Sequence, residues 1–121
     1  MYIIVKGPFT ENMHVLMQHV GYGAHRSPEE ISYTRRTGGD RYPRFHVYPE
    51  MQGENIRVNL HLDMKKHSYE GFSRHQGEYE GKTVQREMDR IQVFLESKTR
   101  AAQQEKKEEK KKGGFFGGFG R

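Results

Sequence analysis

The fold of this chain is decided by residues 44–63, which read RFHVYPEMQGENIRVNLHLD. Apolar and polar residues alternate over residues 44–48 and again over residues 55–63, and this period of two predicts two β-strands. The intervening residues 49–54 contain a proline and a glycine and predict a loop longer than the tightest hairpin turns. We therefore expect an antiparallel hairpin, which is the clearest structural signal in the chain.

The hairpin divides its residues between an apolar and a polar face, because successive side chains of a strand point to opposite sides of a sheet. The apolar face, which we expect to be buried, carries Phe45, Val47, Ile56, Val58, Leu60 and Leu62. The polar face carries Arg44, His46, Tyr48, Arg57, Asn59, His61 and Asp63. With His75 added from the following loop, these residues form a candidate ligand-binding face.

Two interpretations of the polar face stay open. In the first interpretation it is simply the solvated side of an antiparallel sheet, and such faces are usually polar. Alternatively it is a binding site, because histidine, asparagine, tyrosine and aspartate predominate over the lysine, glutamate and threonine that are usual on solvated faces.

A divalent metal ion is one ligand that this face can hold. His61 and Asp63 are two residues apart in a strand, so they project to the same side about 6.5–7 Å apart. With His46 they provide two imidazoles and one carboxylate, a ligand set that is typical of open catalytic metal sites. The pattern predicts His46, His61 and Asp63 as the metal ligands.

The other elements are predicted from local composition and periodicity. Residues 2–5 and 31–36 are β-prone and predict strands, and residues 27–30 predict at most one helical turn. Thr10 is a suitable cap for a helix over residues 11–20, and a second helix is predicted over residues 83–96. The apolar stripes of these helices are Met13, Leu16, Met17 and Val20 in the first, and Val84, Met88, Ile91 and Leu95 in the second.

Together these elements predict an α+β fold, in which an antiparallel sheet of three to four strands carries two helices packed on one face. We expect a single domain over residues 1–96. A charged tail, helical or disordered, follows over residues 97–121 and ends in a segment rich in glycine and phenylalanine.

Composition excludes several classes of protein. The 121 residues contain no cysteine, which excludes disulfides, thiolate metal sites and cysteine nucleophiles and favours the cytoplasm. No apolar run approaches the roughly 20 residues that a membrane-spanning helix needs. The first eight residues are too short and too uncharged to predict a signal peptide.

The net charge of +5 lies in the tail, because residues 1–96 carry equal numbers of basic and acidic side chains. The tail residues that we expect to contact a partner are Lys106, Lys107, Lys110, Lys111, Lys112, Phe115, Phe116 and Phe119. A basic stretch followed by aromatics suits RNA, an anionic surface or a groove on a protein partner. In the polar segment 64–82, Tyr69, Phe72 and Tyr79 either stack on bases or cover the edge of the core.

Two resemblances to known families rest on short motifs. Residues 42–48, 59–63, 68–71 and 75–81, read in order from Tyr42 towards Ile91, resemble a family of short uncharacterised bacterial proteins, and this implies no activity. His61-Leu62-Asp63 and Gly77-Glu78-Tyr79 also resemble motifs of the phosphoesterase domain attached to bacterial end-joining ligases. That resemblance implies that His61 and Asp63 are ligands of a manganese-type site. A histidine that the family has shortly before the first motif is missing here.

Three functional hypotheses follow. The first is a non-enzymatic binding module for RNA, a ribonucleoprotein or another anionic partner, which it contacts through the polar face and the basic tail. The second is a metal-dependent phosphoesterase with a His-x-Asp site. The third is a scaffold whose sheet edge or Phe-rich C-terminus docks on another protein.

Overall fold

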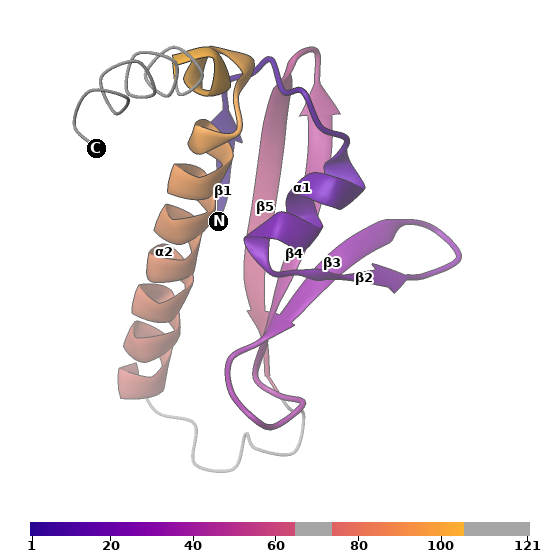
Figure 1. Cartoon of the computed structure of the whole chain (residues 1–121). Coiled ribbons are helices and arrows are strands. Elements are labelled where there is room, and N and C mark those ends of the chain that lie inside the picture. Colours follow the sequence, from indigo (N-terminus) through magenta and orange to yellow (C-terminus); the bar gives the residue numbers. More distant parts are fainter. Residues whose placement is uncertain (65–73, 106–121) are drawn as a thin grey trace, which may run out of the picture.

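The structure is a computed structural model that describes residues 1–64 and 74–105, with the side chains of residues 74–80 left out. The elements follow the order β1 (Tyr2–Val5), α1 (Met13–Val20), β2 (Gly23–Arg26), β3 (Ile31–Arg36), β4 (Arg44–Gln52), β5 (Asn55–Asp63) and α2 (Arg74–Ser97). The strands form one antiparallel sheet in the order β1-β5-β4-β3-β2 (Figure 1). The predicted α+β class is confirmed, with five strands rather than three to four.

The β4–β5 hairpin is longer and tighter than predicted. Its ladder runs from the pair Arg44–Asp63 to the pair Gln52–Asn55, so only Gly53 and Glu54 remain for the turn. Gly53 has a φ of 62°, and a glycine at the first central position is what a type II′ hairpin turn requires. Residues 49–52 therefore extend the strand. The prediction of a long loop there was wrong because it treated Pro49 as a strand breaker.

Strand β2 was not predicted. Its sequence, Gly-Ala-His-Arg, has no apolar alternation and all four residues are exposed, so no periodic signal marks it. It is held as an edge strand by pairing with β3. The turn that follows is closed by Ser27, whose Oγ accepts a hydrogen bond from the Glu30 N–H at 3.2 Å. Residues 27–30 thus form a turn without helix, which agrees with the prediction of at most one helical turn leading into a strand.

Both helices pack on one face of the sheet, as predicted (Figure 1). The core between them contains Val5, Leu16, Met17, Val20, Tyr22, Tyr33, Phe45, Val47, Ile56, Val58, Leu60, Met88, Ile91 and Leu95. The predicted apolar hairpin face is therefore the buried one. Its opposite face, which we call the outer face, carries no helix in the described part of the chain.

The helix limits differ from the predicted ones. Asn12, not Thr10, caps α1, because its side-chain oxygen accepts a hydrogen bond from the Val15 N–H at 2.9 Å. Gly21 ends this helix with a φ of 106°. Helix α2 begins at Arg74 rather than at residue 83, which shortens the predicted loop. In the described ranges 1–64 and 74–105, no helix combines the length and apolar character that crossing a membrane requires.

Candidate functional site

The candidate site lies on the outer face, where the strand register brings the predicted residues together. His46 of β4 is the direct partner of His61 of β5, and Arg44 is the direct partner of Asp63. Directly opposed residues of an antiparallel pair share a face and have Cβ atoms about 4.5–5.5 Å apart. The ladder alone therefore places two imidazoles, a carboxylate and a guanidinium side by side.

The carboxylate of Asp63 is the centre of this cluster. His61 Nε2 lies 2.9 Å from Asp63 Oδ1, and His46 Nδ1 lies 3.0 Å from Asp63 Oδ2. Arg44 donates a longer hydrogen bond of 3.4 Å from Nε to Asp63 Oδ2. One aspartate thus contacts all three of its basic neighbours, and the Asp63 side chain is about one-quarter exposed.

Aromatic rings enclose His46, which is only 7% exposed although it lies on the outer face. The Tyr48 ring is stacked on it with centroids 4.4 Å apart, and the ring of His61 lies 5.1 Å away. His25 of β2 meets it edge-on at 5.6 Å. This burial lowers the pKa of His46 below its ordinary value, against the opposing effect of Asp63, so the neutral imidazole is favoured.

Ser32 of β3 is a site residue that the sequence analysis missed. Its Oγ lies 2.6 Å from His46 Nε2 and 3.3 Å from the carbonyl oxygen of His25. Ser32 and His25 are each separated from the hairpin in sequence and reach it only through the pairing of β2, β3 and β4. Because no local pattern encodes that pairing, no sequence signal was present to find them.

The Ser32 hydroxyl can satisfy either neutral tautomer of His46. It donates to Nε2 when the His46 proton is on Nδ1 and points to Asp63, which fits the short distance of 2.6 Å. It accepts from Nε2–H when Nδ1 is unprotonated, and then turns its own proton to the carbonyl of His25. The second arrangement leaves the Nδ1 lone pair facing Asp63, where it is satisfied by a cation between the two groups or by a hydrogen bond from the Tyr48 hydroxyl, 3.4 Å from Nδ1.

The cluster has dimensions that fit a metal ion. One ligand atom from each of His46, His61 and Asp63 can be chosen so that all three lie within 4.8 Å of one another. Ligand atoms lie about 2.0–2.2 Å from a bound ion, so two of them are about 3 Å apart when the ligand–metal–ligand angle is a right angle. The distances from His46 Nδ1 and His61 Nε2 to the oxygens of Asp63 are close to this value. The Ser32 contact to His46 is the kind of supporting hydrogen bond that orients a metal-bound histidine.

The order of contacts from Ser32 to His46 to Asp63 also matches that of a hydrolase triad, in which serine is the nucleophile. A nucleophile must be reached by its substrate, and Ser32 is only 3% exposed. The serine is therefore placed to orient His46, not to attack a substrate.

Two other predicted residues of the outer face, Arg57 and Asn59, line a hollow and are not among the contacts of Asp63. Arg57 covers the ring of Tyr2 at 4.4 Å and lines a hollow of about 360 Å³ with Asn59 and Tyr48. Glu30 and Glu50 also line that hollow, so its charge is mixed. The side chain of His75, the aromatics Tyr69, Phe72 and Tyr79, and the tail contacts from Lys106 to Phe119 lie outside the described side chains.

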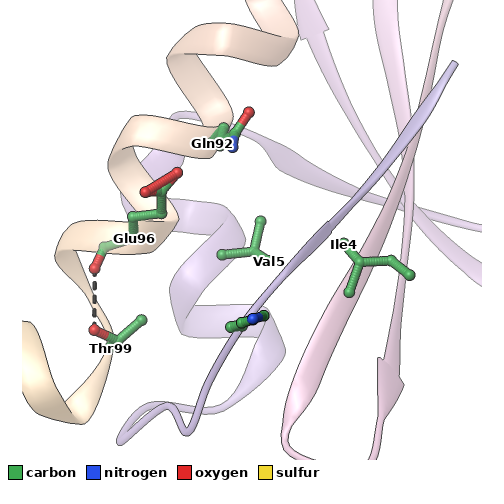
Figure 2. A pocket seen from close by; sticks show the side chains of 6 residues that line it. Ile4, Val5, Gln92, Glu96 and Thr99 are labelled. Carbon is green, nitrogen blue, oxygen red and sulfur yellow. Dashed lines mark hydrogen bonds between the residues drawn. The ribbon is translucent and has the colours of Figure 1, made fainter.

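A second hollow, of about 400 Å³, lies between β1 and α2 (Figure 2). Its lining is formed by Ile4, Val5, Lys6, Gln92, Glu96 and Thr99. The hydroxyl of Thr99 already donates to the Glu96 carbonyl at 3.1 Å. With one lysine and one glutamate as its ionisable groups, this hollow has no cluster that points to catalysis or to a metal.

Comparison with known proteins adds no relative: no family model, curated protein or solved structure matches the chain. The two resemblances described above therefore rest on the quoted motifs alone.

Proposed function

We propose that this protein binds a divalent transition-metal ion through His46 Nδ1, His61 Nε2 and Asp63, and that the ion takes up a phosphate ester. The observation that carries the proposal is the convergence of these three ligand atoms within 4.8 Å. Three protein ligands leave part of the coordination sphere of such an ion open for water or substrate. The ligand set agrees with the manganese-type site that the phosphoesterase resemblance implies.

The neighbouring side chains suit a phosphate ester. A bound divalent ion supplies a Lewis acid for a phosphoryl oxygen and lowers the pKa of a coordinated water. Arg44 lies beside Asp63 at 3.4 Å, where its other N–H groups can bind a phosphate oxygen. Ser32 can accept a hydrogen bond from His46 Nε2–H, which supports the tautomer that leaves Nδ1 free for a metal ion, and the ring of Tyr48 covers one side of His46.

Isothermal titration of the metal-free protein with Mn²⁺ and Zn²⁺ tests the proposal. We expect one ion per chain, and a loss of affinity of more than about 100-fold in His61→Ala, since a direct ligand is removed. His19→Ala is the matched control, because His19 is an exposed histidine on α1, and it should bind as the unchanged chain does. Equal affinity in all three proteins would refute the site.

Hydrolysis is measured separately, as release of 4-nitrophenol from 4-nitrophenyl phosphate and its bis ester in the presence of Mn²⁺. We expect turnover by the unchanged chain and by His19→Ala, and none by His61→Ala. A chain that binds the metal and cleaves neither ester would restrict the proposal to metal binding.

A second candidate is an RNA-binding surface. It is favoured by the exposed aromatics of the outer face, since Tyr2 is 57% exposed and the rings of Tyr48 and His61 are stacked 5.4 Å apart. Rings on an open sheet, with Arg57 beside them, are a surface on which bases can stack. Filter binding of single-stranded RNA at two salt concentrations tests it, and equal retention by Tyr2→Ala and the unchanged chain would contradict it.

The cytoplasm stays part of the proposal, because a chain without cysteine needs no oxidising compartment. Fractionation of cells that express the chain tests this location.

A further inference from the structure

A different site lies on the opposite side of the sheet, where side chains of α2 meet Arg35 near the end of β3. A hollow of about 340 Å³ is lined there by Arg35, Thr37, Phe45, Thr83, Arg86, Glu87 and Arg90. Arg35 is on the helix-covered face, because it pairs with Phe45. Three guanidinium groups and a single carboxylate therefore surround one small hollow, which gives its walls a net charge of +2.

Two of these arginines are fixed in place by the buried carboxylate of Glu87. Arg90 donates to it from Nε at 2.8 Å and from Nη2 at 2.9 Å, and Arg35 donates from Nη1 at 3.2 Å. The hydroxyl of Tyr22 donates a further bond of 2.6 Å. Glu87 is 5% exposed, and both of its carboxylate oxygens accept hydrogen bonds. The carboxylate therefore positions the guanidinium groups, and their charges offset its repulsion of an anionic ligand.

The third arginine, Arg86, is exposed and makes no ion pair with any of the described side chains. It lies four residues before Arg90 on α2, so both side chains project from the same side of the helix. Arg35 uses only Nη1 in its ion pair, which leaves its Nε and Nη2 donors available. Donors thus reach the hollow from a helix and from a strand.

We infer that this hollow binds a dianionic phosphate group, either as inorganic phosphate or as a phosphate monoester. Two net positive charges match a dianion, and guanidinium groups bind phosphate oxygens in a bidentate manner. The hydroxyl of Thr37 donates to the Pro43 carbonyl at 2.9 Å, so the arginines are the donors that recognise the ligand. The hollow is independent of the metal cluster, which lies on the outer face.

Titration calorimetry with inorganic phosphate tests the inference, on protein kept in EDTA at a fixed ionic strength of about 0.15 M, where distant charges are screened. We expect saturable binding that Arg86→Gln weakens by about tenfold or more, the worth of one charge-assisted hydrogen bond. Arg86 takes no part in the Glu87 network, so this variant keeps the fold. Arg100→Gln is the matched control, an exposed arginine beyond the other end of α2, and should bind phosphate unchanged.

Phenyl phosphate and diphenyl phosphate form the second arm of the experiment. The monoester, a dianion, should compete with inorganic phosphate, whereas the diester, which carries one charge, should compete at least about tenfold less well. His61→Ala should bind phosphate as the unchanged chain does, which separates this site from the metal cluster. Absence of saturable binding, or equal binding by Arg86→Gln, would overturn the inference.

Discussion

At the residue scale, the two sides of the sheet each hold one buried ionisable side chain that organises its surroundings. On the outer face this is His46, which is held between Ser32 and Asp63. On the helix-covered face it is Glu87, which accepts hydrogen bonds from Tyr22, Arg35 and Arg90. Both lie between secondary-structure elements, so each joins residues that are distant in sequence.

Glu87 makes the stability of the protein depend on pH in the acid range. Burial by itself would raise the pKa of Glu87, but hydrogen bonds from Arg90 and Tyr22 and the charges of Arg90 and Arg35 hold it below its ordinary value of 4.5. The carboxylate therefore stabilises the folded state above pH 4.5. This contribution is lost as the pH falls through the lower pKa of the folded protein, because the unfolded chain takes up the proton first.

We expect Glu87→Gln to lower the free energy of unfolding by about 1.5–3 kcal/mol at pH 7, since it removes a buried charge that accepts hydrogen bonds from Tyr22 and from two partly exposed arginines. Urea unfolding from pH 7 to pH 3 measures this difference. It should shrink towards acid, because the unchanged chain loses the same charge there. A difference that is constant over the whole range would show that the ionised carboxylate does not stabilise the fold.

The part of the candidate site that was predictable from sequence lies within the single β4–β5 hairpin. His46, His61 and Asp63 alternate within one hairpin, so the period of two was sufficient to place them on one face. Ser32, His25 and the arginines around Glu87 come from elements whose pairing depends on long-range packing. No spacing within a single segment records that pairing, and these residues were found only in the structure.

At the scale of the elements, strand β1 and the β4–β5 turn meet at Gly7. The Gly7 N–H donates to the Asn55 side-chain oxygen at 3.0 Å. A Cβ added to Gly7 would lie 1.8 Å from the carbonyl oxygen of Glu54. Glycine is therefore required here because of the close approach of two backbone segments.

We expect Gly7→Ala to lower the free energy of unfolding by about 1–3 kcal/mol, as overpacking against a backbone atom does. Gly38→Ala is the matched control, because a Cβ at Gly38 meets no atom within 4 Å. Its effect should be within about 0.5 kcal/mol. Urea unfolding of both variants measures these differences. Equal free energies of unfolding for Gly7→Ala and Gly38→Ala would show that the backbone at Gly7 and Glu54 can move apart without loss of stability.

Element boundaries were less predictable than element types. The strands at residues 2–5 and 31–36 and the helix starting near residue 11 were recognised from periodicity and composition. Strand β2 was missed because an exposed edge strand has no apolar alternation. The start of α2 was placed too late because residues 74–82 are polar and glycine-containing, and helices of that composition carry no apolar stripe.

At the scale of the whole molecule, the sheet separates two candidate sites. The helices cover one face, and there α2 forms the hollow with the three arginines together with residues of β3 and β4. No helix of the described residues covers the other face (Figure 1), and there the hairpin presents the histidines and Asp63. A change at one site should leave ligand binding at the other unaffected, since additivity is expected for sites without shared partners.

We propose that a metal cation replaces the proton between His46 and Asp63, and that Ser32 then accepts a hydrogen bond from His46 Nε2–H. Nitrogen-15 NMR of the histidine rings tests it directly, in metal-free protein and at saturating Zn²⁺. We predict that the His46 proton is on Nδ1 without metal and on Nε2 with Zn²⁺, with Nδ1 shifted to the value of a metal-bound nitrogen. A His46 ring whose nitrogen signals do not change when Zn²⁺ is added would contradict the account.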